Sequence, residues 1–192
     1  MKYYQEITLL PPADISLYFI WEKVYQQIHL ALAENKNPDD TSSIGISFPD
    51  YDPGRFSLGG KMHLMAEYDQ NLRTLNVERW LKRLNDYLSI SSINTVPEKM
   101  QGYACFRHVK LKGNKEKLAR RRAKRKGESF EQALSFYDGY QASESRLPYI
   151  NMKSQTNGNN FRIYIEMKVK EQPTVGYFSC YGLSNESTVP LF

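Results

Sequence analysis

The sequence predicts an α+β protein in which a domain with the element order β-α-β-β-α-β precedes a smaller α+β domain containing an arginine-rich helix. Three observations lead to this prediction. Short stretches of the first half alternate apolar and polar residues, which is typical of half-buried strands. Two other stretches carry apolar residues at helical spacing. A segment of nearly pure positive charge interrupts the second half.

The first strand and the first helix are separated by a proline pair. Residues 3–10 alternate, with Ile7 and Leu9 on one face, and Pro11-Pro12 ends the strand. A long amphipathic helix is expected from about Asp14 to Ala33, because its apolar residues form one stripe: Leu17, Trp21, Val24, Ile28 and Leu32.

Three more strands and a second helix complete the first domain. Strands are expected at residues 44–48, 62–66 and 90–96. The helix between the last two, capped by Asp69 or Asn71, has the apolar positions Leu72, Leu75, Leu81, Leu84 and Leu88. This order is the ferredoxin-like arrangement. We therefore place an N-terminal ferredoxin-like domain at residues 1–96.

The second domain, residues 97–192, is expected to contain strands and the basic helix. Tyr103 to Val109 is predicted to be a strand, and Ser129 to Tyr137 a weaker helix. Residues 161–167 alternate strictly, which predicts a half-buried strand, and a last strand is expected at residues 176–181.

The positive charge is concentrated in one segment. Residues 110–126 hold ten Lys or Arg and one acid, a net charge of +9, whereas the whole chain carries +5. Asn114 is a plausible N-cap for a helix over residues 115–126. In such a helix, like charges four residues apart repel one another unless an anionic partner neutralises them. A solvated surface helix is the alternative, but its charges are usually mixed. We expect RNA phosphates to be bound by Arg120, Arg121, Arg122, Lys124 and Arg125.

His29 lies at the border of the apolar stripe of the first helix, beside Tyr25. Its imidazole is expected to project into a half-buried cleft, where a neutral histidine is a competent base near pH 7. The alternative is a boundary histidine with a satisfied hydrogen bond. The three histidines share no metal-ligand spacing, and Asp50 and Asp52 are better explained as turn carboxylates than as a two-metal site. No metal and no other cofactor is expected.

A small polar cluster, residues 153–158, precedes the strand that begins with Phe161. Hydroxyls and amides followed by an exposed aromatic can hold a ribose and stack a base. A polar hairpin turn explains the cluster equally well.

Several classes of protein are excluded. No run of about 18 apolar residues is present, so no membrane partner is expected, and the amino terminus has no signal-peptide core. The two cysteines, Cys105 and Cys180, are too few for a disulfide framework. We expect them to be reduced, buried thiols of a cytoplasmic protein that is a monomer when isolated.

Five elements, in this order, resemble the type I-F CRISPR repeat-processing endoribonuclease family over the whole chain. Two are Ile28-His29 with Ala31-Leu32 and the segment 44–49; the third is the arginine-rich helix. The fourth is residues 153–158 with Phe161-Arg162. The fifth, and most specific, is the ending: residues 178–184 with residues 189–192.

The resemblance implies a function and a set of site residues. It implies metal-independent cleavage of CRISPR repeat RNA at the 3′ base of its stem-loop, with 2′,3′-cyclic phosphate and 5′-hydroxyl products. The enzyme would stay bound to the mature crRNA within the type I-F crRNA-guided surveillance complex. By similarity, His29 is the general base, Ser154 positions the 2′-hydroxyl, and Tyr181 orients the histidine. RNA contacts are expected from Phe161, Gln155 and Thr156.

Two positions depart from the family pattern. An Arg and a Gln, two residues apart, usually precede the arginine-rich helix and read bases beside the cut. Here they are His108 and Lys110, with Arg107 one residue earlier, so either base readout is altered or Arg107 substitutes. The second serine of the polar cluster is Thr156, which keeps the hydroxyl.

Two other classes of function remain open on the residues alone. A non-catalytic RNA-hairpin-binding module of RRM-like topology is one, although the third strand, residues 61–66, lacks the aromatic residues with which an RRM stacks bases. A DNA-binding regulator is the other. Its phosphate contacts would tolerate 2′-deoxy substitution throughout, whereas a ribonuclease needs one particular 2′-hydroxyl.

Overall fold

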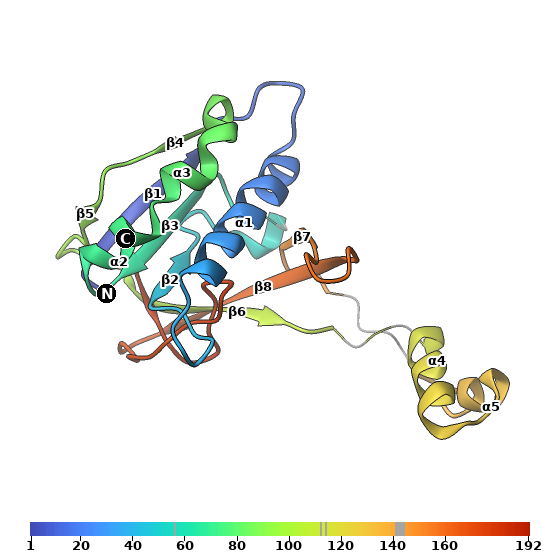
Figure 1. The fold of residues 1–192 in the computed structure, drawn as a ribbon. Helices are drawn as coiled ribbons and strands as arrows, with labels where there is room; N and C mark the ends of the chain where they lie inside the picture. Colours follow the sequence, from blue (N-terminus) through green and yellow to red (C-terminus); the bar gives the residue numbers. More distant parts are fainter. Residues whose placement is uncertain (56, 112, 114, 141–144) are drawn as a thin grey trace. The chain divides into compact units, whose positions relative to one another are not determined.

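The computed structural model describes residues 1–55, 57–111, 113, 115–140 and 145–192. Internal contacts divide the chain into two units (Figure 1). Unit 1 comprises Met1–Val109 together with Leu147–Phe192, and unit 2 comprises Lys110–Arg146.

Unit 1 begins with the predicted β-α-β-β-α-β order. Its first sheet contains β1 (Tyr3–Leu9), β2 (Ile44–Ser47), β3 (Lys61–Ala66), β4 (Leu88–Ile90) and β5 (Asn94–Thr95). The strands run in the order β2-β3-β1-β4, with β5 also pairing with β1, and every pair is antiparallel. This order confirms the ferredoxin-like arrangement. A short 3₁₀ turn, η1 (Pro53–Arg55), lies between β2 and β3.

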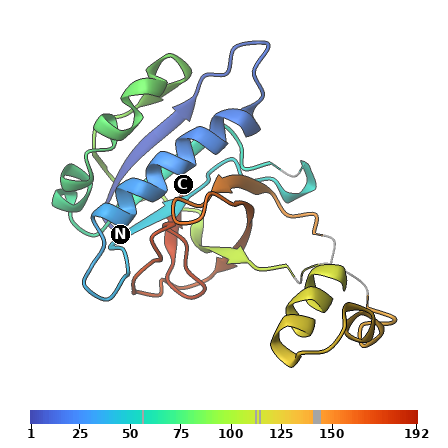
Figure 2. The same ribbon diagram turned by 45° about the vertical axis from the view of Figure 1, so that its right-hand side comes forward.

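Helix α1 (Leu17–Glu34) covers one face of this sheet (Figure 2). It begins at Leu17 and not at Asp14, because Ser16 is extended and its hydroxyl accepts the backbone N–H of Phe19 as an N-cap. The buried side of α1 packs into one hydrophobic core with residues of both sheets of unit 1.

The second predicted helix is broken in two. Asn76 adopts a left-handed conformation (φ 48°, ψ 60°) between α2 (Asp69–Leu75) and α3 (Val77–Leu81), which a 3₁₀ segment, η2 (Lys82–Tyr87), follows. Asparagine tolerates this conformation better than most residues. The expected cap at Asp69 or Asn71 is wrong, because α2 starts at Asp69 with no side-chain cap. The strand expected at residues 90–96 is likewise two shorter strands, β4 and β5.

A second antiparallel sheet completes unit 1. It contains β6 (Gly102–Val109), β7 (Tyr149–Lys153), β8 (Asn160–Lys170) and β9 (Val189–Leu191), in the order β7-β8-β6-β9. The strand expected at residues 176–181 is wrong. There the chain makes only an isolated bridge between Ser42 and Phe178 and then turns tightly, with Gly182 at φ 68°.

Strands β6 and β7 meet the same residue from opposite sides. Val109, the last residue of β6, and Tyr149, the first residue of β7, both pair with Tyr164 of β8. Because β8 lies between them, the backbones of Val109 and Tyr149 are two strand spacings, or roughly 10 Å, apart. The whole of unit 2 is therefore inserted between two neighbouring points of one sheet.

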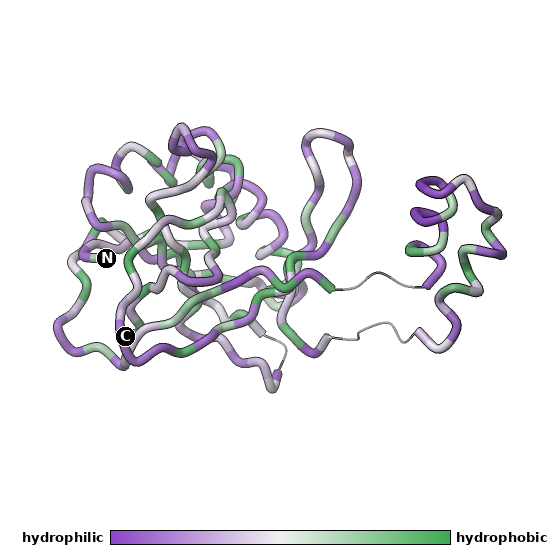
Figure 3. The backbone as a smooth tube through the Cα atoms, turned by 90° about the horizontal axis from the view of Figure 1, so that it is seen from below, coloured by the Kyte–Doolittle hydropathy of each residue, from purple (hydrophilic) through white to green (hydrophobic). Residues whose placement is uncertain are grey.

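Unit 2 is a pair of helices. α4 (Lys115–Lys126) confirms the predicted basic helix, whereas the proposed cap at Asn114 lies outside the described residues. α5 (Phe130–Ser135) begins with a capping box between Ser129 and Gln132. Figure 3 shows hydrophilic and hydrophobic stretches in both helices. The two pack through small residues, because Ala119 and Ala133 are the buried ones.

The domain boundary expected between residues 96 and 97 falls between the two sheets, but the division into units 1 and 2 does not follow it. The two-domain organisation therefore stays a prediction. None of the helices in the described part of the chain combines the length and apolar character that a membrane span requires.

Candidate active site

Two residues of α1, one turn apart, hold the C-terminal segment against the helix. The buried hydroxyl of Tyr25 donates to the carbonyl oxygen of Tyr181 at 2.8 Å, and Nδ1 of His29 lies 2.9 Å from the carbonyl oxygen of Cys180. Residues at i and i+4 share one helix face. Two successive peptide carbonyls of the segment are therefore fixed at two points on α1.

The contact to Cys180 determines the tautomer of His29. A carbonyl oxygen can only accept a hydrogen bond, so Nδ1 must carry the proton. Nε2 then keeps its lone pair. The imidazole is half-buried, and in the neutral ring Nε2 is the nitrogen that can take up a proton.

Tyr181 packs flat against this imidazole. The two ring centroids are 4.1 Å apart and the ring planes differ by 6°. Burial raises the pKa of the Tyr181 hydroxyl, with a smaller contribution from Cys180, so the ring stays neutral. Stacking restricts rotation of the imidazole about its side-chain bonds, which completes the fixation that the Nδ1 contact begins.

A tight turn brings Tyr181 to this position. Gly182 donates its N–H to Ser179 O, and Ile46 of β2 donates its N–H to Gly182 O. A Cβ atom at Gly182 would lie only 2.4 Å from the Ile46 side chain. Glycine is thus required both for the left-handed backbone and for the close approach to β2.

The polar cluster forms the turn between β7 and β8. Ser154 and Asn159 close it by a backbone hydrogen bond of 2.9 Å. Gln26, one turn before His29 on α1, accepts the backbone N–H of Lys153 at 3.0 Å. This contact ties the residue next to Ser154 to the helix that carries the imidazole. Ser154 is half-buried, and the predicted contacts Gln155 and Thr156 are exposed.

Strand alternation sorts the predicted base-reading residues between the two faces of the second sheet. His108 pairs with Ile165, and Phe161 lies on the same face, the one that packs into the core with α1. Arg107 is on the opposite face, where its guanidinium forms an ion pair with Glu166. Arg107 therefore cannot take the place of a residue at position 108 without crossing the sheet. Lys110 is exposed and belongs to unit 2.

The basic side chains of α4 are not equivalent. Arg120, Arg121, Lys124 and Arg125 are exposed. Arg122 forms an ion pair with Glu128 and lies 3.8 Å above the ring centroid of Phe136. The exposed four can meet a polyanion, although Arg120 also lies 5.9 Å from the ring centroid of Phe130. Arg122 instead connects α4 to residues of unit 2 beyond it.

The other candidate ligands have structural partners. Asp52 accepts the backbone N–H groups of Gly54 and Arg55, which confirms a turn carboxylate. His63 is buried against Glu6 and Phe192. Within the described residues, no three His, Cys, Asp or Glu side chains gather to hold a metal ion. Cys105 is buried as expected, but Cys180 is only half-buried.

The sequence does not indicate two of the residues that build the site. It marks Tyr25 only as a neighbour of His29, although the spacing of four residues places both on one helix face. Gln26 gives no signal, because its partner, the backbone of Lys153, is distant in the sequence.

The fold and the site define a ferredoxin-like protein with a histidine fixed by a backbone carbonyl and a stacked tyrosine in one unit and a strongly basic helix in another. The family model for CRISPR-associated proteins of the type Cas_Csy4 matches residues 4–192. The chain belongs to this family.

Two curated relatives match along the full length of both chains. Each is described as a CRISPR-associated endonuclease Cas6/Csy4, and each is 32% identical to this chain: one from Escherichia coli over 196 residues, the other from Pseudomonas aeruginosa over 193 residues. A solved structure described as an RAMP protein binding different RNA substrates covers 98% of this chain and 100% of its own, with 8% identity and a TM-score of 0.39, a similarity too low to carry an argument.

Proposed function

We propose that the protein is an endoribonuclease that cleaves CRISPR repeat RNA at the 3′ base of its stem-loop by attack of an internal 2′-hydroxyl. One observation carries the proposal: Nδ1 of His29 is committed to the Cys180 carbonyl, so Nε2 is left as a base. Family membership and the endonuclease names of the two relatives supply the class of reaction.

The chemistry needs one base and accurate positioning. Nε2 of His29 takes the proton of the 2′-hydroxyl, and O2′ attacks the neighbouring phosphorus. The O2′–P bond forms as the P–O5′ bond breaks, and the leaving O5′ takes up a proton from His29 or water. The products are a 2′,3′-cyclic phosphate and a 5′-hydroxyl. Because the nucleophile is already next to the phosphate, positioning and deprotonation are enough, and we propose a metal-independent course.

Three further residues support this step. Ser154, next to the residue that Gln26 holds, positions the 2′-hydroxyl. Phe161 stacks on a base near the cut from the core-side face of the second sheet. Tyr181 is a positioning residue, because it acts on the imidazole by stacking and not on the RNA.

Recognition is divided between the two units. The exposed cations Arg120, Arg121, Lys124 and Arg125 meet the phosphates of the stem, which supplies affinity but no base identity. We assign the reading of bases beside the cut to His108 and Lys110. Arg107 is paired with Glu166 on the opposite face of the sheet, so any RNA contact that it makes is separate from this reading.

The biological setting follows the family. We propose that the protein is a cytoplasmic monomer when isolated, stays on its crRNA product and joins the type I-F surveillance complex. Incubation with RNA transcribed from the neighbouring CRISPR array tests the function. A single cut at the 3′ base of each hairpin, leaving a cyclic phosphate, is expected. Tight binding without any cut would instead establish the hairpin-binding module.

A further inference from the structure

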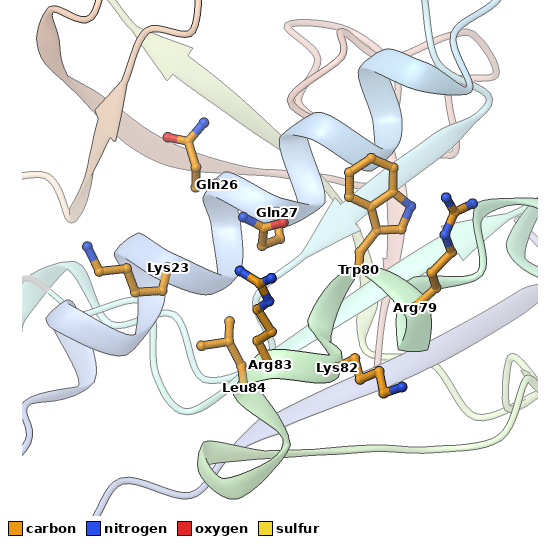
Figure 4. Close-up of a pocket in the computed structure, with 8 residues that line it drawn as sticks. All are labelled: Lys23, Gln26, Gln27, Arg79, Trp80, Lys82, Arg83 and Leu84. Atoms are coloured by element: carbon orange, nitrogen blue, oxygen red, sulfur yellow. The ribbon is translucent and has the colours of Figure 1, made fainter.

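A basic groove with an indole in its wall lies between α1 and the α3–η2 segment of unit 1. Its volume of about 500 Å³ is within the range of small-ligand sites. Lys23 and Gln26 project from α1, and Arg79, Trp80, Lys82 and Arg83 come from the facing segment (Figure 4).

The groove is positively charged. No carboxylate among the described residues lines it. Arg79, Lys82 and Arg83 are exposed and form no ion pair with any residue that the structure describes. Lys23 does pair with Glu22 at the rim, at 2.8 Å. Three unpaired cations beside a half-buried indole are suited to a ligand with both phosphates and an aromatic ring.

Gln26 connects this groove to the turn that carries Ser154. A second groove, of about 390 Å³, shares Lys23 and Gln26 with the first and is also lined by Lys153 and Gln155, which flank Ser154. The two grooves adjoin at these two side chains of α1 and together make a path that ends beside Ser154. Glu22 is the acidic residue that lines its second part.

The amide of Gln26 has an unused donor on this path. Its oxygen must be the atom that faces the N–H of Lys153, which fixes the orientation of the amide. Its Nε2 is buried and has no hydrogen-bond partner among the described residues. A buried N–H₂ group without an acceptor is costly. Because Nε2 is covered in this structure, an oxygen of a phosphate or ribose in the groove reaches it only when the surrounding side chains move aside.

We propose that this path binds the single-stranded RNA downstream of the cut, with a base stacked on Trp80 and phosphates at Arg79, Lys82 and Arg83. The inference rests on the proposed cleavage function. Lys23 lies six residues before His29 on α1, which is about 9 Å at 1.5 Å per residue. An unpaired strand extends further per nucleotide than a duplex does, so very few nucleotides beyond the cut are needed to cover this distance. Bases upstream of the cut are paired in the stem, so only unpaired bases can stack on the indole.

Binding of non-cleavable hairpins tests the proposal. Each hairpin carries a 2′-deoxy group at the last nucleotide of its stem, where the cut would occur. One hairpin has no extension, one has a short unpaired 3′ extension, and one has a 5′ extension of equal length. The 3′ extension should tighten binding to the unmodified protein. Trp80→Ala should weaken binding of the 3′-extended RNA at least about fivefold, the lower limit for one stacked base, whereas Trp80→Phe should keep most of the affinity.

The variants are chosen to separate binding from folding. Trp80 packs partly against the core, so the double variant Arg79→Ala/Arg83→Ala, which changes only exposed side chains, must give the same selective loss. Arg73→Ala is the matched control, because Arg73 is an exposed cation of α2 that pairs with Asp69 away from the groove. It should leave the affinity for all three hairpins unchanged.

The outcomes are distinct. The proposal is overturned if the 3′ extension adds no affinity to the unmodified protein, if the variants weaken all hairpins equally, or if only the 5′-extended hairpin is affected. An unchanged affinity in every variant would also overturn it and leave an acidic protein segment as the occupant. Failure of the proposed function looks different, because the unmodified protein would then leave an all-ribose 3′-extended hairpin uncut, whatever its affinity for the three hairpins.

Discussion

The imidazole of His29 and the phenol ring of Tyr181 are stacked, with centroids 4.1 Å apart and planes within 6° of parallel. The stack and the Nδ1 contact to Cys180 act on different degrees of freedom of one side chain. The first fixes the plane of the ring, and the second fixes its rotation within that plane. Together they fix the direction in which Nε2 points.

Replacing His29 should separate chemistry from binding. His29→Ala is expected to abolish cutting of the hairpin and to leave its affinity within about threefold, since a base contributes mainly in the transition state. Cleavage is measured on a gel and affinity by filter binding. A single 2′-deoxy substitution upstream of the scissile phosphate should have the same effect on the unmodified enzyme. Cleavage of that RNA at the normal rate would show that water is the nucleophile.

Changes at the two tyrosines should have different effects. Tyr181→Phe keeps the stack and should reduce the cleavage rate only slightly, whereas Tyr181→Ala should reduce it strongly with little change in affinity. Tyr25→Phe leaves the Tyr181 carbonyl without its buried donor, so it should lower the free energy of unfolding by about 1–3 kcal/mol, measured by urea denaturation. Equal rates for Tyr181→Ala and the unmodified enzyme would refute the positioning role.

The sequence predicted helix α1 and the basic helix α4 because the signal for each lies within the helix itself. The stripe from Leu17 to Leu32 determined α1, and the uninterrupted charge determined the basic helix. His29 could be placed at the edge of a stripe in the same way. The Cys180 carbonyl could not be predicted, because it is 151 residues away and backbone atoms leave no mark in a residue pattern. Tyr181 is indicated as a partner only by the family resemblance.

The wrong assignments each have a physical reason. A left-handed residue such as Asn76 breaks a helix whose apolar spacing continues across it. The segment 176–181 alternates like a strand, yet the requirement to place Tyr181 against His29 makes it a turn at Gly182. At Gly182 the contacts with Ile46 determine the backbone, whereas at Asn76 a single left-handed residue interrupts the helix.

The salt dependence of binding should distinguish the arginines of α4. Arg121→Ala and Arg125→Ala should each flatten the slope of log K against log salt by roughly 0.7–0.9 for every phosphate that the protein no longer neutralises. Arg122→Ala should instead speed amide hydrogen exchange in α4 and α5, because it removes the interactions with Glu128 and Phe136. If the slope is the same in all three variants as in the unmodified protein, α4 is not the element that binds RNA.

Removal of metal ions should not affect the reaction. Cleavage of the cognate hairpin is expected to proceed at full rate in excess EDTA, because the proposed step requires only an internal nucleophile and an imidazole. The rate with added magnesium serves as the reference. An absolute need for magnesium would overturn the metal-independent course and would return attention to Asp50 and Asp52.

Acidification should destabilise the fold through the pair His63 and Glu6. Burial lowers the pKa of His63, although the hydrogen bond to Glu6 opposes this. Burial acts to raise the pKa of Glu6, but its hydrogen bonds, first that from His63, outweigh it and leave the pKa lowered. Both groups therefore bind protons more readily in the unfolded chain, and stability is lost as the pH falls below about 6.5 for His63 and about 4.3 for Glu6.

The His63 contribution can be isolated with a residue that does not titrate. Between pH 7.5 and pH 5.5, the Tm of the unmodified protein should fall further than that of His63→Gln, which keeps an amide donor for Glu6. Differential scanning calorimetry in the same two buffers gives both values. Parallel losses in the two proteins would assign the acid sensitivity to other groups.

Residues 110–146 are inserted between two strands that pair with Tyr164 from opposite sides. This arrangement has a consequence for how the family can diversify. Both ends of that segment attach to fixed neighbouring points of a finished sheet, so another segment with the same short span between its ends would fit without altering any strand register. Exchange of this segment would alter the phosphate binding that we propose for α4, while His108, His29 and Tyr181 of unit 1 keep their surroundings. The proposed affinity for RNA and the proposed chemistry could therefore change independently within one chain.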